Sequence, residues 1–335
     1  MRYLYLRLLF LFLMLSPHLS VHPSSEKKES IIEEEKSSRA PSNIKKRVGV
    51  ISNFEQATIS PLLEFISSQT GLECRLIRQL SIPEDAAAAQ GEEYDLFLGT
   101  CPQRIPAKII KRNTKALKGL DPSLYRDGIL IWSRWYSCIA INRLFSDEIE
   151  LNIEKLKGKI TTLDPQKDRL VWLVLYTLYD TYGKEILEDI NSLIPLYRES
   201  REELIFTIES GSYPSILGID GYLTESIKKG YPIDLVYSSF ARDKYPVTTV
   251  AGENIAYIPR SAENPEGADY ILDFLMGTPF QSYLAEKSFQ PSRSEKQKPQ
   301  NTIPVQCNLD RADEFHTQWM EIAFPEIIEE MVEKM

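Results

Sequence analysis

The chain has 335 residues, of which 43 % are hydrophobic and 10 % aromatic, enough to bury the cores of about two domains of about 150 residues each. This composition excludes intrinsic disorder, a collagen-like repeat and a disulfide-dense miniprotein as descriptions of the whole chain. Lys and Arg number 39 against 48 Asp and Glu, a net charge of −9, which argues against nucleic-acid binding but leaves room for a local basic pocket.

The N-terminus has the pattern of a secretory signal over residues 1–22. Arg2 and Arg7 supply the positive charge, and Leu8–Leu15 is the apolar run. Such a run rises only about 12 Å as a helix, less than the about 30 Å of a bilayer core, so we expect a cleaved signal; the alternative is an uncleaved anchor. Residues 23–46 are charged, Ser-rich and poor in large apolar side chains, which predicts a flexible leader.

The next part of the chain alternates strand and helix patterns. Residues 47–52, 74–77 and 94–99 have the apolar runs of short strands, and residues 61–66 have helical spacing that Gly71 ends. This order predicts a parallel sheet covered by helices.

The second half repeats this pattern. Strands are predicted at 159–163, 215–218 and 234–236, and an aromatic-rich amphipathic helix at 168–182. Two α/β units joined near the middle of the chain are therefore expected.

The last third is predicted to return to the first unit, with a strand at 254–258 and a helix from about Pro265 to Leu284. Residues 310–335 predict an acidic helix interrupted at Pro325. This helix either packs on its own domain or binds a partner.

Catalytic motifs argue against an enzyme. His316 is the only histidine outside the signal region, and the chain has no Gly-x-Ser-x-Gly, no phosphate-binding loop and no Gly-x-Gly-x-x-Gly. Acidic residues are numerous, but their spacing singles out no catalytic carboxylate pair. We therefore expect neither catalysis nor a cofactor.

The four cysteines, Cys74, Cys101, Cys138 and Cys307, are far apart in the sequence. Their spacing does not fit a zinc site. One or two disulfides are compatible with an oxidising compartment, whereas Cys74 and Cys138, inside apolar runs, also fit buried free thiols.

Small polar or basic residues follow several predicted strands. Ser52-Asn53 ends the first strand, Thr100 ends the strand over 94–99, and Asp164–Lys167 precedes a helix. Ligands of open α/β sheets bind at the carboxyl ends of strands, where helix N-termini attract anions. Ordinary helix capping is the alternative at each position, but together these residues predict a cleft between two lobes.

Residues 47–284 resemble the periplasmic solute-binding proteins of ABC importers, in the ferric-type branch of extracellular solute-binding family 1. The motifs that carry the resemblance are, in chain order, Asp95–Gly99, Leu156–Ile160, Asp164-Pro165, Gly230–Tyr237, Ile255–Pro259, Ala262–Ala268, Ile271–Leu275 and Phe280-Gln281. Each motif alone is degenerate, and their order and spacing over more than two hundred residues make the resemblance specific.

The resemblance implies the α/β, two-lobed fold of type II periplasmic binding proteins, in which each lobe is a sheet covered by helices. Lobe 1 would comprise 47–138 and 249–290, lobe 2 would comprise 139–248, and 291–335 would be a C-terminal extension with a helix. Two hinge strands are expected, near Cys138–Asn142 and Val236–Val250. The family role implies a periplasmic monomer that closes on a small solute and delivers it to a membrane permease.

The resemblance leaves two classes of ligand open. Ferric members coordinate iron through adjacent tyrosines, but this chain has Gly221-Tyr222 at that place. A ferric site would have to draw on Tyr136, Tyr213, Tyr222 and Tyr237, and hard ferric iron prefers several anionic oxygen donors. Relatives in the same branch bind organophosphates such as sugar phosphates and phosphonates. A small phosphorylated anion is therefore the favoured ligand, and a solute-sensing subunit for a membrane signalling protein is a further alternative.

Family members place an arginine facing the cleft where this chain has Arg134. Its guanidinium would hold a phosphate through two parallel hydrogen bonds; the alternative is stacking on Trp132 or Trp135 at the surface. Arg198 and Arg201 offer further cations for the ligand, but a solvated helix face is the favoured interpretation for both. Asp220 would accept hydrogen bonds from ligand hydroxyls. The predicted ligand-binding residues are Ser52, Asn53, Thr100, Arg134 and Tyr136 from lobe 1, and Lys167, Asp220 and Tyr222 from lobe 2.

Overall fold

The computed structural model describes residues 39–80, 93–101, 109–111, 121–148, 157–237, 244–287, 289–292, 299, 301–305 and 310–326. Apart from residue 39, this part of the chain belongs to one unit, Ala40–Met335.

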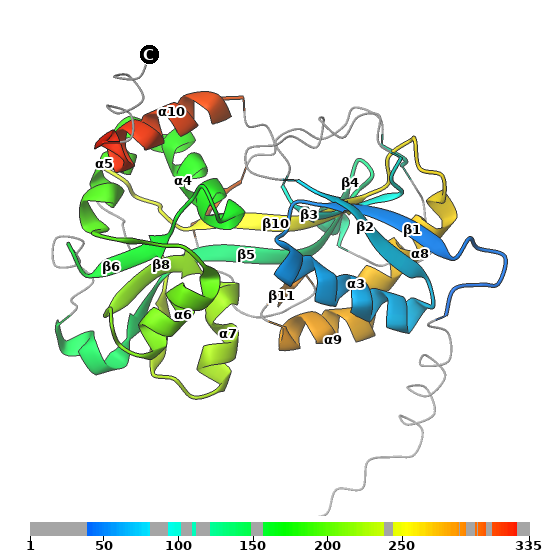
Figure 1. Ribbon diagram of the computed structural model, residues 1–335, viewed down its shortest axis with the longest axis horizontal. Helices are drawn as coiled ribbons and strands as arrows, with labels where there is room; N and C mark the ends of the chain where they lie inside the picture. The colour runs from blue at the N-terminus through cyan, green and yellow to red at the C-terminus, as the bar shows by residue number, and fades with distance from the viewer. Residues whose placement is uncertain are drawn as a thin grey trace, which may run out of the picture. The chain divides into compact units, whose positions relative to one another are not determined.

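Two hydrophobic cores divide this unit into two lobes (Figure 1). The core of lobe 1 gathers buried side chains between Val48 and Trp132 and again between Ile255 and Leu284. The core of lobe 2 lies mainly between Trp135 and Leu223 and is completed by residues near the C-terminus. The two-lobed α/β fold expected from the sequence is confirmed.

Lobe 1 is a sheet with helices against it. Its elements are β1 (Arg47–Ser52), α3 (Gln56–Thr70), β2 (Glu73–Gln79), β3 (Leu96–Thr100), η3 (Pro122–Leu124), β4 (Tyr125–Arg126), α8 (Pro265–Leu275) and α9 (Thr278–Glu286). Strand β1 pairs parallel with both β2 and β3, as predicted. Gly71 ends α3 in the left-handed conformation, at φ 73°, where a side chain would be strained. The single helix expected from Pro265 to Leu284 is two helices, because Pro279 has no N–H with which to continue the hydrogen bonds of α8.

Lobe 2 follows the same plan. Its elements are η4 (Arg143–Glu148), β6 (Ile160–Leu163), α4 (Arg169–Tyr182), α5 (Lys184–Leu193), β7 (Tyr197–Arg198), α6 (Arg201–Glu209), β8 (Ser215–Ile219), α7 (Asp220–Lys228) and β9 (Ile233–Val236). Strand β6 pairs parallel with β7 and β8. Ten of the fourteen residues of α4 are buried, so this helix lies in the interior of lobe 2, as its aromatic and aliphatic composition requires.

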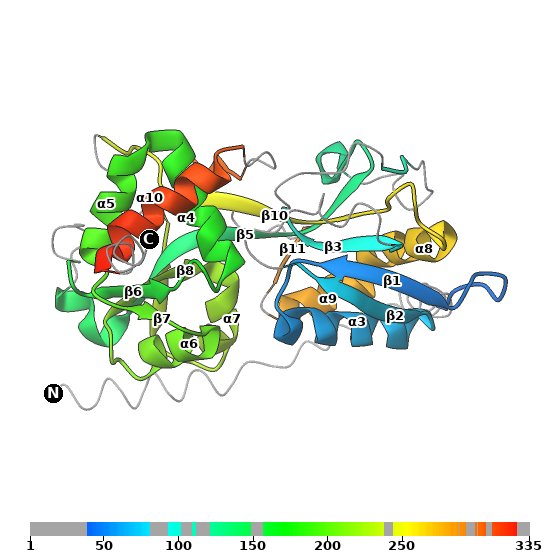
Figure 2. The same ribbon diagram turned by 45° about the horizontal axis from the view of Figure 1, so that its top comes forward.

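Two long strands run from one lobe into the other (Figure 2). Strand β5 (Ile129–Asn142) pairs antiparallel with β10 (Val250–Tyr257) over its first half, and with β8 and β9 over its second half. One hydrogen-bonded path, β2-β1-β3-β10-β5-β8-β6-β7, thus passes through both lobes. The first predicted hinge lies inside β5. The second predicted hinge, Val236–Val250, runs from the end of β9 to the start of β10, and the chain crosses as β10, from Val250 onward.

The C-terminal segment contacts both lobes. Strand β11 (Gln290–Pro291) pairs with β5, β12 (Ile303–Pro304) pairs with the start of β10, and α10 (Ala312–Ala323) lies against lobe 2. Phe315 and Trp319 of α10 are fully buried there. The expected interruption at Pro325 is seen, since α10 ends at Ala323. Of the two alternatives for this helix, packing on its own chain is the one observed.

The predicted signal peptide and Cys307 lie outside the described residues. Residues 40–46, which the sequence assigns to the end of the leader, lie against lobe 1, where Ala40 donates its N–H to Thr70 O at 2.8 Å. Within the described ranges, no helix is both long and apolar enough to cross a membrane. Cys101 is disulfide-bonded, whereas Cys74 and Cys138 are free thiols whose pKa burial raises.

Candidate functional site

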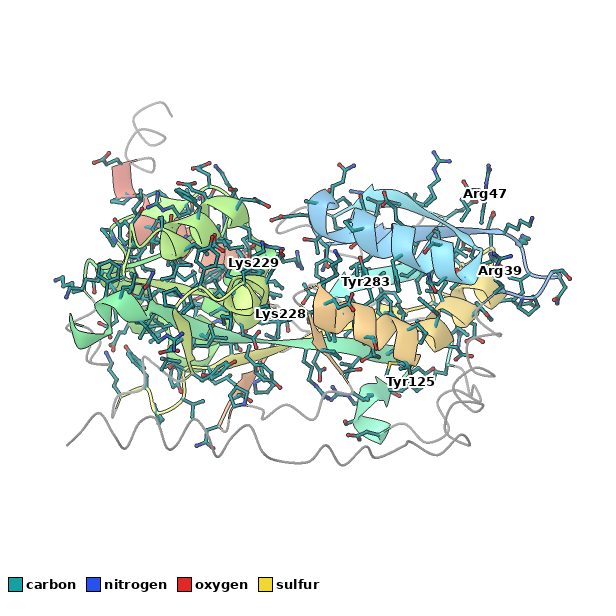
Figure 3. The ribbon with its side chains drawn as sticks, turned by 90° about the horizontal axis from the view of Figure 1, so that it is seen from below. Arg39, Arg47, Tyr125, Lys228, Lys229 and Tyr283 are labelled. Carbon is teal, nitrogen blue, oxygen red and sulfur yellow. The ribbon has the colours of Figure 1, made fainter. Side chains whose placement is uncertain are left out.

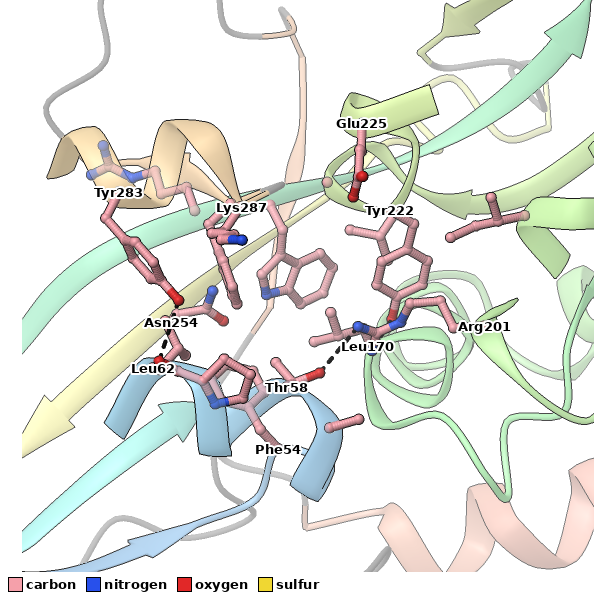
Figure 4. A pocket seen from close by; sticks show the side chains of 18 residues that line it. Phe54, Thr58, Leu62, Leu170, Arg201, Tyr222, Glu225, Asn254, Tyr283 and Lys287 are labelled. Carbon is pink, nitrogen blue, oxygen red and sulfur yellow. Dashed lines mark hydrogen bonds between the residues drawn. The ribbon is translucent and has the colours of Figure 1, made fainter. Parts of the chain in front are cut away.

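A cavity of about 260 Å³ lies between the two lobes (Figure 4). Helices α3 and α9 of lobe 1 face helices α6 and α7 of lobe 2 across it, and the crossing strands β5 and β10 contribute residues to its lining. Concave sites with apolar walls and a few charged groups are the usual form of small-ligand sites. The cavity is therefore the candidate functional site.

Arg134 of β5, which the resemblance places facing the cleft, is among the residues that line this cavity. Its side chain is 16 % exposed, and its Nε lies 3.7 Å from Glu253 Oε1. The other oxygen of Glu253 accepts a 2.8 Å hydrogen bond from Arg126, outside the cavity. Arg134 thus shares its carboxylate with another cation, so Glu253 neutralises it only in part.

Arg201 is a second cation of the cavity, although it is not among the predicted ligand-binding residues. It was expected on a solvated helix face, but only 24 % of its side chain is exposed. As the first residue of α6, it lies over the Tyr222 ring, 4.1 Å from the ring centroid, and its Nη2 is 3.6 Å from Asp168 Oδ2. Burial within lobe 2 thus takes this guanidinium out of bulk water and directs it toward lobe 1.

Asp168 and Tyr222 contact the side chain of Arg201 and are hydrogen-bonded to each other. The Tyr222 hydroxyl donates to the Asp168 carboxylate, at 2.8 and 2.9 Å from its two oxygens. Asp168 also caps helix α4 by accepting from Val171 N at 2.9 Å. Burial raises the pKa of Tyr222 well above its ordinary value, so its ring carries a neutral phenol.

Arg201 also connects the lobes directly. Its Nη1 donates to Thr58 Oγ1 of α3 at 3.1 Å, and its Nη2 lies 4.0 Å from Glu55 Oε2 (Figure 4). A second bridge forms at the edge of the lobes, where Lys228 at the end of α7 donates to the carbonyl of Ala285 in α9 (Figure 3). The lobes therefore contact each other through polar groups around the cavity.

The remaining charges of the lining are one cation and one carboxylate. Lys287 follows α9, and Glu225 lies in α7. Lys229 pairs with Glu225 at 2.8 Å and, through that hydrogen bond, lowers the pKa of Glu225. Among the described residues that line the cavity, Arg134, Arg201 and Lys287 are cations and Glu225 is a carboxylate. The two arginines also lie within 4.0 Å of carboxylates outside the lining, so the positive charge that favours an anion is partly neutralised.

Three predicted residues, Ser52, Asn53 and Thr100, are buried in the framework of lobe 1 and do not line the cavity. Ser52 Oγ accepts from Phe54 N at 3.1 Å. Asn53 donates to Thr100 O at 3.0 Å and accepts from Thr100 N at 2.9 Å, which ties the end of β1 to the end of β3. These polar side chains lie at the strand ends because their hydrogen bonds connect the strand ends at this edge of the sheet.

Asp220 and Tyr136 join lobe 2 to the crossing strand rather than lining the cavity. Asp220 is buried at the start of α7, and its Oδ1 accepts from Tyr136 N at 3.1 Å and from Gly221 N at 2.8 Å. Its carboxylate is thus engaged by two backbone N–H groups and by the Tyr237 hydroxyl within the protein. Lys167 is exposed and pairs with Glu199, so it too lies away from the cavity lining.

The four tyrosines considered for iron do not converge. Only Tyr222 lines the cavity. Tyr237 lies with its hydroxyl 3.4 Å from Asp220 and its ring 6.4 Å from that of Tyr136, whereas Tyr213 lies under Arg198. Burial raises the pKa of Tyr136, Tyr222 and Tyr237, which makes their phenolates costly to form. Within the described residues, no group of three or more His, Cys, Asp or Glu could hold a metal ion.

No protein-family model matches the sequence, and no curated protein sequence matches it. Solved structures share its fold, which is that of two-lobed periplasmic binding proteins. Iron-bound HitA from Pseudomonas aeruginosa superposes with a TM-score of 0.63 at 14 % identity, over 84 % of this chain and 100 % of that chain.

Two further structures share the fold. AfuA from Actinobacillus pleuropneumoniae, with fructose-6-phosphate bound, has a TM-score of 0.61 at 15 % identity, over 83 % of this chain and 98 % of its own. A two-component system protein described as mediating signal transduction has a TM-score of 0.56 at 16 % identity, over 82 % of this chain and 99 % of its own. At these identities the likeness concerns the fold, which different ligands share.

Proposed function

We propose that this chain is an exported solute-binding protein that captures a small organic anion, an organophosphate, between its lobes and delivers it to the permease of an ABC importer. The observation that carries the proposal is that two arginines, Arg134 from the crossing strand and Arg201 from lobe 2, are among the residues that line one interlobe cavity. Guanidinium forks match phosphoryl oxygens in geometry and charge.

Hinge closure is the proposed mechanism. Arg201 donates to Thr58 on the opposite lobe, and an anion that contacts both Arg201 and Arg134 would add contacts that exist only when the lobes are together. A ligand shifts a conformational equilibrium by its differential affinity for the two states. The bound anion therefore stabilises the closed form, which the permease would recognise, and a monomer in the periplasm suffices for this role.

Iron is the weaker proposal for this site. HitA binds iron in the same fold, but in this chain Tyr222 is the only one of the four candidate tyrosines on the cavity wall, and its hydroxyl already donates to Asp168. AfuA has fructose-6-phosphate bound in the same fold, and a phosphoryl group suits a lining that contains arginines better than a ferric ion does. Sensing for a membrane signalling protein would use the same closure and differs only in the partner.

A thermal-shift titration tests the proposal. Inorganic phosphate, phenylphosphonate, glucose 6-phosphate and ferric citrate are each added to the purified chain. A ligand at 100 times its dissociation constant stabilises the folded chain by about 2.7 kcal/mol, so a phosphoryl compound should raise the melting temperature. A shift with ferric citrate alone would contradict the proposal and favour an iron-binding role.

A further inference from the structure

The wall of the interlobe cavity is mostly apolar between its charged groups. Phe54 and Leu62 of lobe 1 face Leu170, Ile205 and Ile219 of lobe 2 across it. A ligand that fills this space places most of its surface against carbon. The charged groups can hold only the part of the ligand that reaches them.

The hydroxyl groups of this wall are already engaged with the protein. Tyr222 donates to Asp168, Tyr283 donates to Pro61 O at 3.2 Å, and Thr58 accepts from Arg201. The neutral polar groups left over among the described residues are the O–H of Thr58 and the side chain of Asn254, whose Oδ1 is buried and unpartnered. One hydroxyl and one amide cannot satisfy the several hydroxyls of a sugar, and a hydroxyl that loses water without a new partner weakens binding.

Trp135 gives the cavity a rigid aromatic surface. The ring is 3 % exposed and lies flat against the backbone of Gly252, where a Cβ would come within 1.9 Å of it. Its Nε1 donates to Thr100 Oγ1 at 3.3 Å, so the indole has no donor left for a ligand. Thr100, predicted as a ligand contact, is therefore a positioning residue that acts through Trp135.

A second aromatic surface adjoins the first. The rings of Phe54 and Phe289, both on the cavity wall, lie edge to face with centroids 6.2 Å apart, and Phe54 makes a similar contact with Trp132 at 6.1 Å. Aromatic rings packed in this way stay in place and offer an apolar body a fixed surface. The cavity thus combines cations with aromatic and aliphatic walls.

We propose that the cavity selects phosphoryl anions whose organic body is apolar, such as aryl or alkyl phosphonates and phosphomonoesters of apolar alcohols, over sugar phosphates. This inference rests on the proposed function. The phosphoryl group contacts Arg134 and Arg201, and the body of the ligand lies against Trp135 and the facing side chains of lobe 2. The ligand class expected from the sequence includes both sugar phosphates and phosphonates, and this inference narrows it to the compounds with an apolar body.

Isothermal titration of the full chain with phenylphosphonate, glucose 6-phosphate and inorganic phosphate tests this selection. We expect phenylphosphonate to bind at least about tenfold more tightly than glucose 6-phosphate, with the more negative heat-capacity change that burial of apolar surface produces. Equal or tighter binding of glucose 6-phosphate would overturn the inference and leave the proposed anion site standing. Binding of none of the three would overturn both.

A pair of variants on α6 distinguishes an effect of the cavity wall on ligand selection from a general effect on the fold. Ile205 lines the cavity, and its neighbour Phe206 is 66 % exposed on the outer side of the same helix. Ile205→Asn should weaken phenylphosphonate binding about tenfold while changing the binding of inorganic phosphate little, whereas Phe206→Asn should leave both unchanged. If Ile205→Asn folds and keeps the full preference for phenylphosphonate, the apolar wall does not select the ligand.

Discussion

The guanidinium of Arg201 lies over the Tyr222 ring, 4.1 Å from its centroid, while the hydroxyl of that ring donates to Asp168. The contact holds a cation of lobe 2 in one orientation with an aromatic face on one side and a carboxylate 3.6 Å away. Because Arg201 also donates to Thr58 of lobe 1, it takes part both in the lining of the cavity and in the contact between lobes.

The Tyr222 hydroxyl should contribute to stability more than a surface phenol does. Tyr222→Phe removes a buried hydrogen bond to a carboxylate, and we expect it to lower the free energy of unfolding by about 1.5–3 kcal/mol. Urea denaturation measures this loss. Tyr231→Phe, on a side chain that is 38 % exposed, is the control and should change the stability by less than about 0.5 kcal/mol. Equal effects of the two variants would contradict this role of Tyr222.

The two arginines that share Glu253 offer a matched test of the anion site. Arg134→Gln should weaken the binding of inorganic phosphate about tenfold or more, because a charge-assisted contact inside the cavity is lost. Arg126→Gln removes the other cation that pairs with Glu253, which lies outside the cavity, and should change the affinity for inorganic phosphate less than about twofold. Isothermal titration compares the two. An equal loss of phosphate affinity in both variants would contradict a contact between Arg134 and the anion, because only the net charge of the chain would then affect binding.

Asn53 should prove structural rather than ligand-binding. Asn53→Ala leaves the N–H and C=O of Thr100 buried without their partner, which we expect to cost about 2–4 kcal/mol of unfolding free energy. Asn53→Asp keeps an acceptor for Thr100 N but places a buried carboxylate oxygen against Thr100 O, and should destabilise the chain at least as much as Asn53→Ala. Chemical denaturation gives the order. If Asn53→Ala retains full stability and loses phosphate binding, Asn53 acts on the ligand instead.

The docking of α10 should depend on pH through one exposed pair. Arg311 donates to both oxygens of Glu314, at 2.9 and 3.1 Å, and to the Tyr179 hydroxyl of lobe 2 at 2.7 Å. The hydrogen bond from Arg311 lowers the pKa of Glu314 from 4.5 to about 2. A carboxyl group whose pKa is lower in the folded than in the unfolded chain stabilises the fold at pH values above its unfolded pKa. This stabilisation disappears as the pH falls from 4.5 toward 2.

The variant Glu314→Gln tests this dependence. Above pH 5 it should melt at a lower temperature than the unchanged chain, and the difference should shrink as the pH falls toward 2. Thermal melts at several pH values measure it. A difference that stays constant down to pH 2 would show that the charge on Glu314 does not stabilise α10.

The sequence predicts most of the fold because its signals are local. The apolar run of residues 47–52 forms β1 over that range, and Gly71 ends a helix as its freedom at positive φ allows. The break between α8 and α9 was missed, although Gly277 and Pro279 mark it in the sequence. The range given for the second crossing was wide because no local pattern tells a strand within one lobe from a strand that leaves it.

The candidate site is less predictable because distant contacts form it. Arg201 meets Tyr222, 21 residues later, and Thr58, 143 residues earlier, and neither separation leaves a trace in local periodicity. Conversely, polar residues at strand ends are frequent both in ligand sites and in sheet edges, so Asn53 and Thr100 were indistinguishable from ligand contacts. Arg134 was found only because the resemblance assigned it a role.

A crystal structure of the chain with phenylphosphonate would show where the anion binds. We expect the phosphoryl group in the interlobe cavity, with oxygens within about 3.2 Å of guanidinium nitrogens of Arg134 and Arg201 and the phenyl ring against Trp135. A phosphoryl group bound elsewhere, with the cavity filled by ordered water, would contradict this expectation.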